Sequence, residues 1–234
     1  MRELALSIGE PFTSPGWGSN LVFFSGDPGK VISEADAKEY LRRACKYAQH
    51  YEVYLIPERF MLMGYQCMCL ISPGGKVIGA QRAIHLYHPA SPSAKRGTEI
   101  DVINTEFGGI FLCVDVDIYH PEVVRIAAQT GAAFVFCAQR IKGEDYANHM
   151  VVTGLWGAAQ SGGVFSVGVS NQFHAVCAPL ALTPMEDGFL VNPTKKTPLL
   201  VKMCADDLER CQRRRPLSRK LYAVHRNELV DWIT

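Results

Sequence analysis

The stretch FGGIFLCVDVDIYHPEVVRIAAQTGA, residues 107–132, decides the fold. Its first part, GGIFLCVDV, is apolar and β-branched almost without alternation, which is typical of a strand covered on both faces. Its second part has Pro121 in the first turn of a helix, where the missing N–H costs no hydrogen bond. Gly131 then gives that helix a natural C-terminal stop. The stretch therefore predicts a buried strand that runs directly into a helix.

Strands and helices alternate on both sides of this stretch. Short apolar runs predict further strands at residues 4–8, 53–57, 102–105, 133–139 and 164–171, and hairpins at 68–81 and 178–192. Helices are predicted at residues 33–50, where Ser33 is the N-cap, and at 146–163. Residues 9–29 are rich in Gly, Pro and Ser and predict no regular element. The order is that of a layered α/β sandwich.

The composition fits one domain over residues 1–234, since 48% of the residues are hydrophobic. The net charge is +1, from 24 basic and 23 acidic residues, so nothing indicates a nucleic-acid or anionic-membrane partner. No apolar run reaches the length of a membrane-spanning helix, and residues 1–12 lack the pattern of a secretory signal. We therefore expect a cytoplasmic protein.

The eight cysteines lie mostly in apolar stretches and form no matching pair of CxxC motifs. Such cysteines are typical of buried thiols in a reducing compartment. We therefore expect neither disulfides nor a zinc site, and no cofactor.

Residues 51–86, YEVYLIPERFMLMGYQCMCLISPGGKVIGAQRAIHL, resemble the central segment of the nitrilase (carbon–nitrogen hydrolase) superfamily. In that family a hairpin ends in a Tyr-Arg-Lys-x-His-Leu signature. Here the signature reads Gln81-Arg82-Ala83-Ile84-His85-Leu86. The resemblance therefore places Ala83 at the position of the catalytic lysine, with Arg82 and His85 in supporting positions.

Residues 107–132 resemble the nucleophile elbow of the same family, which reads Cys-x-Asp, three residues, then Pro-Glu. This register places Asp115 at the cysteine and puts Asp117 and Glu122 in supporting positions. The family's first catalytic glutamate matches Glu10, in LALSIGEPFTSPGWG, better than Glu58.

The rest of the chain follows the family with two departures. A helix that carries a further glutamate in the family reads GLWGAAQSGGVF here, with Ser161 at the acidic position. The chain also resembles a member that begins at the family's second strand, so that the first strand and helix are missing. The resemblance implies a four-layer α-β-β-α sandwich. It also implies a homodimer or larger homo-oligomer, because a missing strand exposes a sheet edge.

The resemblance implies altered chemistry, because the family's Glu-Lys-Cys triad becomes Glu10-Ala83-Asp115. In the family the cysteine attacks the amide or nitrile carbon while the lysine stabilises the developing negative charge. Ala83 supplies no charge, and a carboxylate is a much poorer nucleophile than a thiolate. Asp115 should also stand close to Glu10, and of two unneutralised carboxylates that share a site one should hold a proton near neutral pH.

Three functions remain open at this point. The chain is a non-catalytic protein that binds a small molecule or assembles, or an enzyme that uses the Glu10 and Asp115 carboxylates, or an amidase that uses Cys113 as an alternative nucleophile. On a regular strand Cys113 and Asp115 point to the same side. A buried core thiol is nevertheless the favoured interpretation of Cys113. An Asp115–Asp117–His120 metal site is disfavoured, because side chains diverge where a strand turns into a helix.

Overall fold

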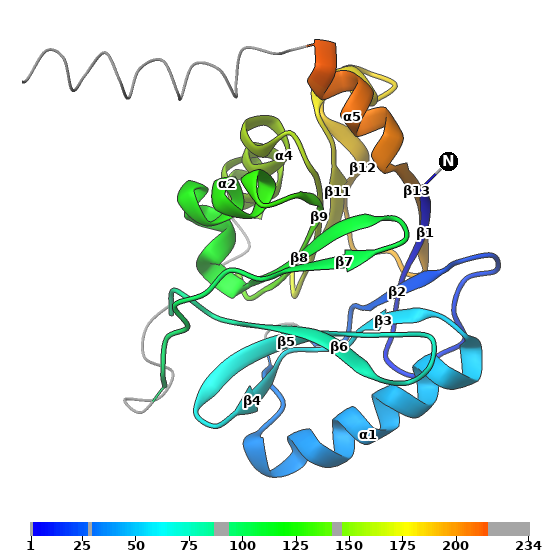
Figure 1. The fold of residues 1–234 in the computed structure, drawn as a ribbon, viewed down its shortest axis with the longest axis vertical. Coiled ribbons are helices and arrows are strands. Elements are labelled where there is room, and N and C mark those ends of the chain that lie inside the picture. The colour runs from blue at the N-terminus through cyan, green and yellow to red at the C-terminus, as the bar shows by residue number, and fades with distance from the viewer. Residues whose placement is uncertain (1, 28–29, 87–93, 142–146, 215–234) are drawn as a thin grey trace, which may run out of the picture.

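Two β-sheets pack face to face between layers of helices (Figure 1). The structure is a computed structural model, and it describes residues 2–27, 30–86, 94–141 and 147–214. Within these residues the first sheet contains β1 (Glu3–Gly9), β2 (Leu21–Phe24), β3 (Tyr54–Ile56), β4 (Phe60–Leu62), β5 (Tyr65–Ile71), β6 (Val77–Arg82) and β13 (Leu199–Cys204). The second contains β7 (Val102–Thr105), β8 (Gly108–Val114), β9 (Ala132–Gln139), β10 (Phe165–Ser170), β11 (His174–Cys177) and β12 (Phe189–Thr194).

Each sheet has a parallel centre and antiparallel flanks. The order of the first sheet is β13-β1-β2-β3-β5-β4, with β6 paired to β5, and β1, β2 and β3 run parallel. The order of the second is β12-β11-β10-β9-β8-β7, with β8, β9 and β10 parallel. The carboxyl ends of parallel strands share one edge of a sheet, where sites commonly form.

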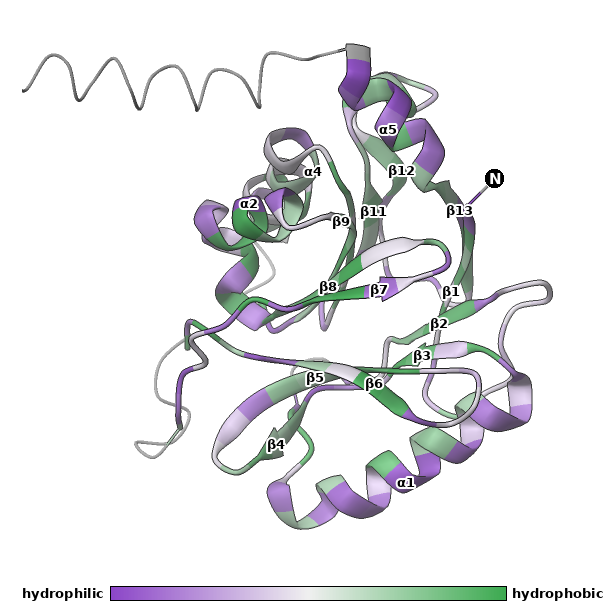
Figure 2. Ribbon diagram, viewed as in Figure 1, coloured by the Kyte–Doolittle hydropathy of each residue, from purple (hydrophilic) through white to green (hydrophobic). Residues whose placement is uncertain are grey.

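The helices are α1 (Glu34–Tyr51), the 3₁₀ turn η1 (Asp115–Tyr119), α2 (Pro121–Gln129), α3 (Ala147–Val151), the π turn η3 (Val152–Trp156), α4 (Gly157–Gly162), the 3₁₀ turn η4 (Leu180–Leu182) and α5 (Ala205–Arg214). Helices cover the outer faces of the two sheets, whereas Ala205 and Leu208 of α5 pack into the core between the sheets. The buried stripe of α1, which includes Ala37, Ala44 and Ala48, packs on the first sheet. Residues of α2 and α4 pack on the second sheet. Figure 2 shows the polar residues of α1 on its side away from the strands.

The largest core lies between the sheets. Alternate residues of the two parallel centres point inward, so that Phe23 of β2 meets Phe136 of β9 edge to face, with ring centroids 5.6 Å apart. Helix, sheet, sheet and helix form four layers, which confirms the predicted α-β-β-α sandwich.

Several elements differ from the sequence prediction. Residues 9–29 contain the fully buried strand β2, which the sequence prediction missed because Gly, Pro and Ser residues surround it. The predicted first strand of the 178–192 hairpin is wrong, because residues 180–182 form a 3₁₀ turn after Pro179. The strand that pairs with β12 is β11, which ends before this turn. Strand β1 is paired on both sides, with β2 and with β13, so the exposed edge expected next to it is absent from the described residues. No helix occurs in the link between β1 and β2.

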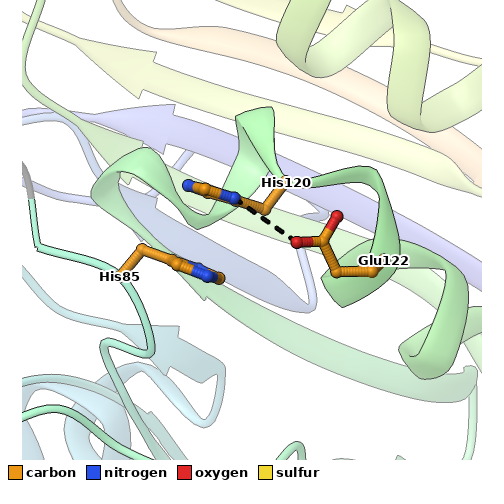
Figure 3. A group of neighbouring side chains, drawn as sticks. All are labelled: His85, His120 and Glu122. Atoms are coloured by element: carbon orange, nitrogen blue, oxygen red, sulfur yellow. Dashed lines mark ion pairs between the residues drawn. The ribbon is translucent and has the colours of Figure 1, made fainter.

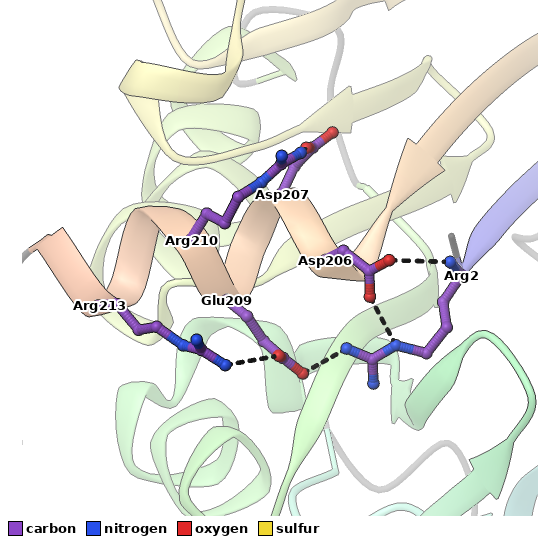
Figure 4. Close-up of polar contacts among 6 residues, drawn as sticks. All are labelled: Arg2, Asp206, Asp207, Glu209, Arg210 and Arg213. Carbon is purple, nitrogen blue, oxygen red and sulfur yellow. Dashed lines mark hydrogen bonds and ion pairs between the residues drawn. The ribbon is translucent and has the colours of Figure 1, made fainter.

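The start and the end of the described chain lie side by side. Strand β13 pairs with β1, and Figure 4 shows Arg2 reaching two acids of α5. The guanidinium Nε of Arg2 lies 2.7 Å from Asp206 Oδ1, and its Nη2 pairs with Glu209. Such exposed pairs orient α5 but contribute little stability.

No helix in the described part of the chain is long and apolar enough to cross a membrane.

Candidate functional site

The elbow at the end of β8 has a left-handed backbone at Asp115. Its φ angle is 55°, whereas the residue before it is still extended. A non-glycine residue with positive φ is uncommon, although aspartate tolerates it better than most. The chain then passes through η1 into α2, which begins at Pro121 as the sequence predicts. The turn aims the side chain of Asp115 away from the direction that a regular strand would give it.

Asp115 forms a buried ion pair with Arg59. The Nη1 atom of Arg59 lies 2.6 Å from Asp115 Oδ2, and the two side chains are 1% and 14% exposed. Asp115 Oδ1 also accepts the backbone N–H of Arg140 at 3.0 Å. Arg59 Nη1 lies 3.4 Å from Gln66 Oε1 on β5. A cation from the first sheet thus neutralises the carboxylate at the end of the second.

Sequence analysis missed Arg59. It follows the strand β3 in the motif IPERF, where a basic residue next to the apolar Phe60 at the end of a buried strand is the available signal. The structure also corrects the expectation that Asp115 is unneutralised, because Arg59 forms an ion pair with it. Glu10 lies exposed after β1, and its Oε1 accepts the hydroxyl of Ser25 at 3.4 Å.

Glu58, the alternative to Glu10 as the catalytic acid, forms hydrogen bonds next to the end of β2. Its carboxylate accepts the hydroxyl of Tyr40 at 3.1 Å and the backbone N–H of Asp27 at 3.2 Å. A Cβ atom at Gly26 would lie 2.0 Å from Glu58 Oε1, so the carboxylate occupies the space that a side chain at position 26 would need.

Ala83 lies in the core between the sheets. It is 1% exposed and follows β6, and its backbone N–H donates to the carbonyl of Gln66 at 2.9 Å. The preceding Arg82 is exposed and places its guanidinium 4.5 Å from the ring centre of Tyr65. The position matched to the lysine thus provides no charge, and its neighbour stacks on an aromatic ring instead.

Asp117 ties the elbow to the loop after β6. Its fully buried carboxylate accepts the backbone N–H groups of Ile84 at 3.0 Å and His85 at 2.7 Å, and its Oδ1 lies 2.9 Å from His85 Nδ1. Burial raises the pKa of Asp117, while these hydrogen bonds act in the opposite direction. Three contacts from one carboxylate hold His85 and its loop against the elbow.

Cys113 belongs to the helix-side core. It is 0% exposed and packs with residues of α2, and burial raises its thiol pKa. The predicted common direction of Cys113 and Asp115 is wrong, because the left-handed turn redirects Asp115 toward Arg59. A buried thiol with a raised pKa is a poor nucleophile.

Ser161 lies on α4, away from the elbow contacts. Its exposed hydroxyl donates to the carbonyl of Gly157 at 2.7 Å, one turn earlier in the same helix. Glu122 is exposed at the start of α2. A hydrogen bond from its own backbone N–H lowers the pKa of its carboxyl group, and the nearby His120 has a smaller effect in the same direction. Neither side chain contacts Asp115 in the described contacts.

Two cavities lie near the strand ends, and the lining of neither includes Asp115 or Glu10. The first has a volume of about 410 Å³ and is lined by His85, Leu86, Arg96, Val116, Tyr119, His120 and Met150. The second, of about 250 Å³, is lined by Gly26, Asp27, Ser170, Asn171, Gln172, Phe173, His174 and Lys195.

The architecture matches solved structures over nearly the whole chain, although neither a family model nor a curated protein matches the sequence. The carbon–nitrogen hydrolase from Helicobacter pylori G27 is similar with a TM-score of 0.76 at 14% identity, over 97% of this chain and 98% of that one. Nit3 of Saccharomyces cerevisiae, a member of branch 10 of the nitrilase superfamily, has a TM-score of 0.72 at 14% identity, over 92% and 95%.

An amidase from Nesterenkonia sp. AN1 is similar with a TM-score of 0.67 at 17% identity, over 96% of each chain. It was solved as a mutant with the acetamide moiety of fluoroacetamide added to its active-site cysteine. Identities this low establish the fold alone, and the chain therefore has the nitrilase-superfamily fold.

Proposed function

We propose that this chain is a member of the nitrilase superfamily that no longer hydrolyses carbon–nitrogen bonds and instead binds a small molecule or assembles through its fold. The observation that carries the proposal is the Arg59–Asp115 ion pair at the elbow. In the Nesterenkonia amidase the active-site cysteine takes up an acetamide moiety. Here the elbow residue is a carboxylate held by a guanidinium at 2.6 Å.

A carboxylate in this setting is a weak nucleophile. Its charge is balanced by Arg59, and one of its oxygens also accepts a backbone N–H. Both contacts engage the oxygens that would attack a substrate carbon, which lowers their nucleophilicity. A base must also have a lone pair free to accept a proton, and the ion pair with Arg59 and the N–H of Arg140 engage both oxygens of Asp115. These contacts argue against the alternative enzyme that would use Glu10 and Asp115 as an acid–base pair.

The second part of the lost mechanism is charge stabilisation. A tetrahedral intermediate needs a donor or cation beside the developing oxyanion. Ala83 has neither, and Arg59, the buried cation near the elbow, is engaged by Asp115. The burial of Cys113 also argues against the alternative thiol amidase.

A hydrolysis screen tests the proposal. Purified protein is incubated with amides, N-carbamoyl compounds and nitriles, products are measured by mass spectrometry, and the Glu10→Gln, Asp115→Asn and Cys113→Ala variants run in parallel. We expect no turnover above the protein-free blank. Turnover lost in the Asp115 or Glu10 variant would establish the carboxylate enzyme, and turnover lost only in the Cys113 variant would establish the thiol amidase. An active nitrilase-superfamily amidase serves as the positive control.

Assembly is the second part of the proposal. The elbow helices expose apolar side chains, with Ile126 on α2 45% exposed and Val152 in η3 50% exposed. Burying such residues in a homodimer would remove them from water. Light scattering after size exclusion tests this part. We expect a dimer that Ile126→Glu dissociates, whereas a monomeric wild-type protein would contradict it. Leu62→Glu, at an exposed apolar position on β4, is the matched control.

A further inference from the structure

A group of three metal-ligand side chains lies beside the elbow. His85 comes from the loop after β6, His120 stands between η1 and α2, and Glu122 lies in the first turn of α2. One ligand atom from each lies within 4.8 Å of the others. Figure 3 shows the three side chains next to one another beside the elbow. Imidazole nitrogens and carboxylate oxygens are the ligands that zinc and neighbouring divalent metals accept. The sequence offers His120 as a metal ligand only together with Asp115 and Asp117, an arrangement that it disfavours. In the structure the possible ligands next to His120 are His85 and Glu122.

Asp117 prepares His85 for this task. Its carboxylate accepts two backbone N–H groups and lies 2.9 Å from His85 Nδ1, so the network assigns the ring proton to Nδ1. The lone pair of the neutral ring is then on Nε2. Metal-binding histidines characteristically donate their other ring N–H to a carboxylate, which fixes the ring and raises its basicity. The fully buried Asp117 supplies this support without being a ligand itself.

The site also has room for an exchangeable ligand. His85 and His120 both line the cavity of about 410 Å³ beside the elbow. Three protein ligands with an open fourth position are typical of metal sites that keep a water or bind a further molecule. A fully enclosed structural site would offer no such space.

One adjustment accompanies binding. The two imidazole rings are stacked, with centroids 3.4 Å apart and an angle of 8° between their planes. Lone pairs in two parallel rings do not converge on one ion, so one ring must turn. His120 and Glu122 have side chains that are 38% and 60% exposed, whereas Asp117 holds His85. His120 is therefore the ring that turns, and its Nδ1 already lies 3.5 Å from Glu122 Oε1.

We propose that His85, His120 and Glu122 bind one divalent transition-metal ion of the zinc class, with the adjacent cavity supplying the position of a fourth, exchangeable ligand. The site is separate from the Arg59–Asp115 pair. The test of this site measures metal binding rather than hydrolysis, so its result does not depend on the proposed loss of activity.

Calorimetric titration of chelator-treated protein with Zn²⁺ tests the proposal, together with the visible absorption of the Co²⁺ form. We expect one equivalent to bind the wild-type protein. The His120→Ala and Glu122→Gln variants should bind at least about tenfold more weakly, since even outer-shell changes commonly cost about 10–100-fold. The control is His50→Ala, which removes an exposed histidine whose ring meets Tyr51 of α1 edge to face.

Three results would overturn the site. They are an absence of binding at micromolar Zn²⁺, an affinity that His120→Ala leaves unchanged, and a thiolate-to-cobalt charge-transfer band, which would assign the metal to cysteines. Circular dichroism of each variant separates loss of ligands from loss of fold, and both ligand variants change exposed side chains.

Discussion

Arg59→Met should destabilise the protein strongly, because it leaves the Asp115 carboxylate without its cation. The atoms of the pair are 2.6 Å apart, and two unit charges at this separation attract by about 6 kcal/mol at an effective dielectric constant of about 20. Desolvation of both groups offsets much of this attraction. The loss on removing one partner of a buried pair is nevertheless about 3–5 kcal/mol, since the other charge stays buried.

The lower end of this range applies here. Asp115 keeps 14% exposure and the N–H of Arg140, so water and one backbone donor continue to stabilise its charge. We therefore expect a loss of about 3 kcal/mol, out of a total that is about 5–15 kcal/mol for typical proteins. With a urea m-value of about 3 kcal/mol/M, the midpoint should fall by about 1 M.

Urea unfolding followed by circular dichroism measures this loss for Arg59→Met, Asp115→Asn and the double variant. Asparagine is chosen because it tolerates the positive φ at this position. The double variant should be more stable than the sum of the single losses predicts, with a coupling of about 1.5 kcal/mol or more. Single losses that simply add, or a loss below about 1 kcal/mol for Arg59→Met, would refute the reasoning. Arg42→Met, in an exposed pair with Glu39, should leave the midpoint unchanged.

Three further predictions concern other buried groups. Burial lowers the pKa of His174, so the unfolded chain binds the proton more readily than the folded protein. The stability that the neutral ring contributes is therefore present above about pH 6.5 and is lost as the pH falls through the folded pKa. Urea midpoints at stepwise lower pH should fall less in His174→Gln than in the wild type. Cys113 should resist iodoacetamide in the native protein, as peptide mass spectrometry would show, and its labelling before unfolding would contradict its burial. Gly109→Ala should lose about 1–3 kcal/mol in urea unfolding, since its Cβ would lie 2.3 Å from the carbonyl oxygen of Gly131; an unchanged midpoint would contradict this, and Gly74→Ala, with no atom nearer than 3.8 Å, is the control.

The sequence predicts local elements well where short-range chemistry determines them. Helix α1 begins after Ser33, whose hydroxyl accepts the N–H of Asp36 at 3.3 Å, because a cap and its partner are three residues apart in the chain. The elbow is predicted for a similar reason, since strand, turn and Pro121 follow one another directly. The positions that carry these signals agree with the structure.

The candidate site is harder to predict, because its contacts join distant segments. Arg59 follows β3 of the first sheet and Asp115 follows β8 of the second, and no local pattern indicates that they meet. His85 and His120 come together only when the loop after β6 packs on the elbow, through Asp117. Strand β2 is short and lies in a turn-rich segment, so its buried character appears only once its neighbours β1 and β3 are in place.

The left-handed turn at Asp115 restricts how this protein can change by mutation. The turn holds a carboxylate at its first residue, and Arg59 is bound to that carboxylate. Replacing Asp115 by cysteine first would leave a buried guanidinium facing a neutral thiol, and replacing Arg59 first would leave an uncompensated carboxylate. Each single substitution therefore passes through a variant that is destabilised by a buried charge without its ion-pair partner. The residues at positions 59 and 115 therefore depend on each other, and a cysteine at position 115 requires a coordinated substitution at position 59.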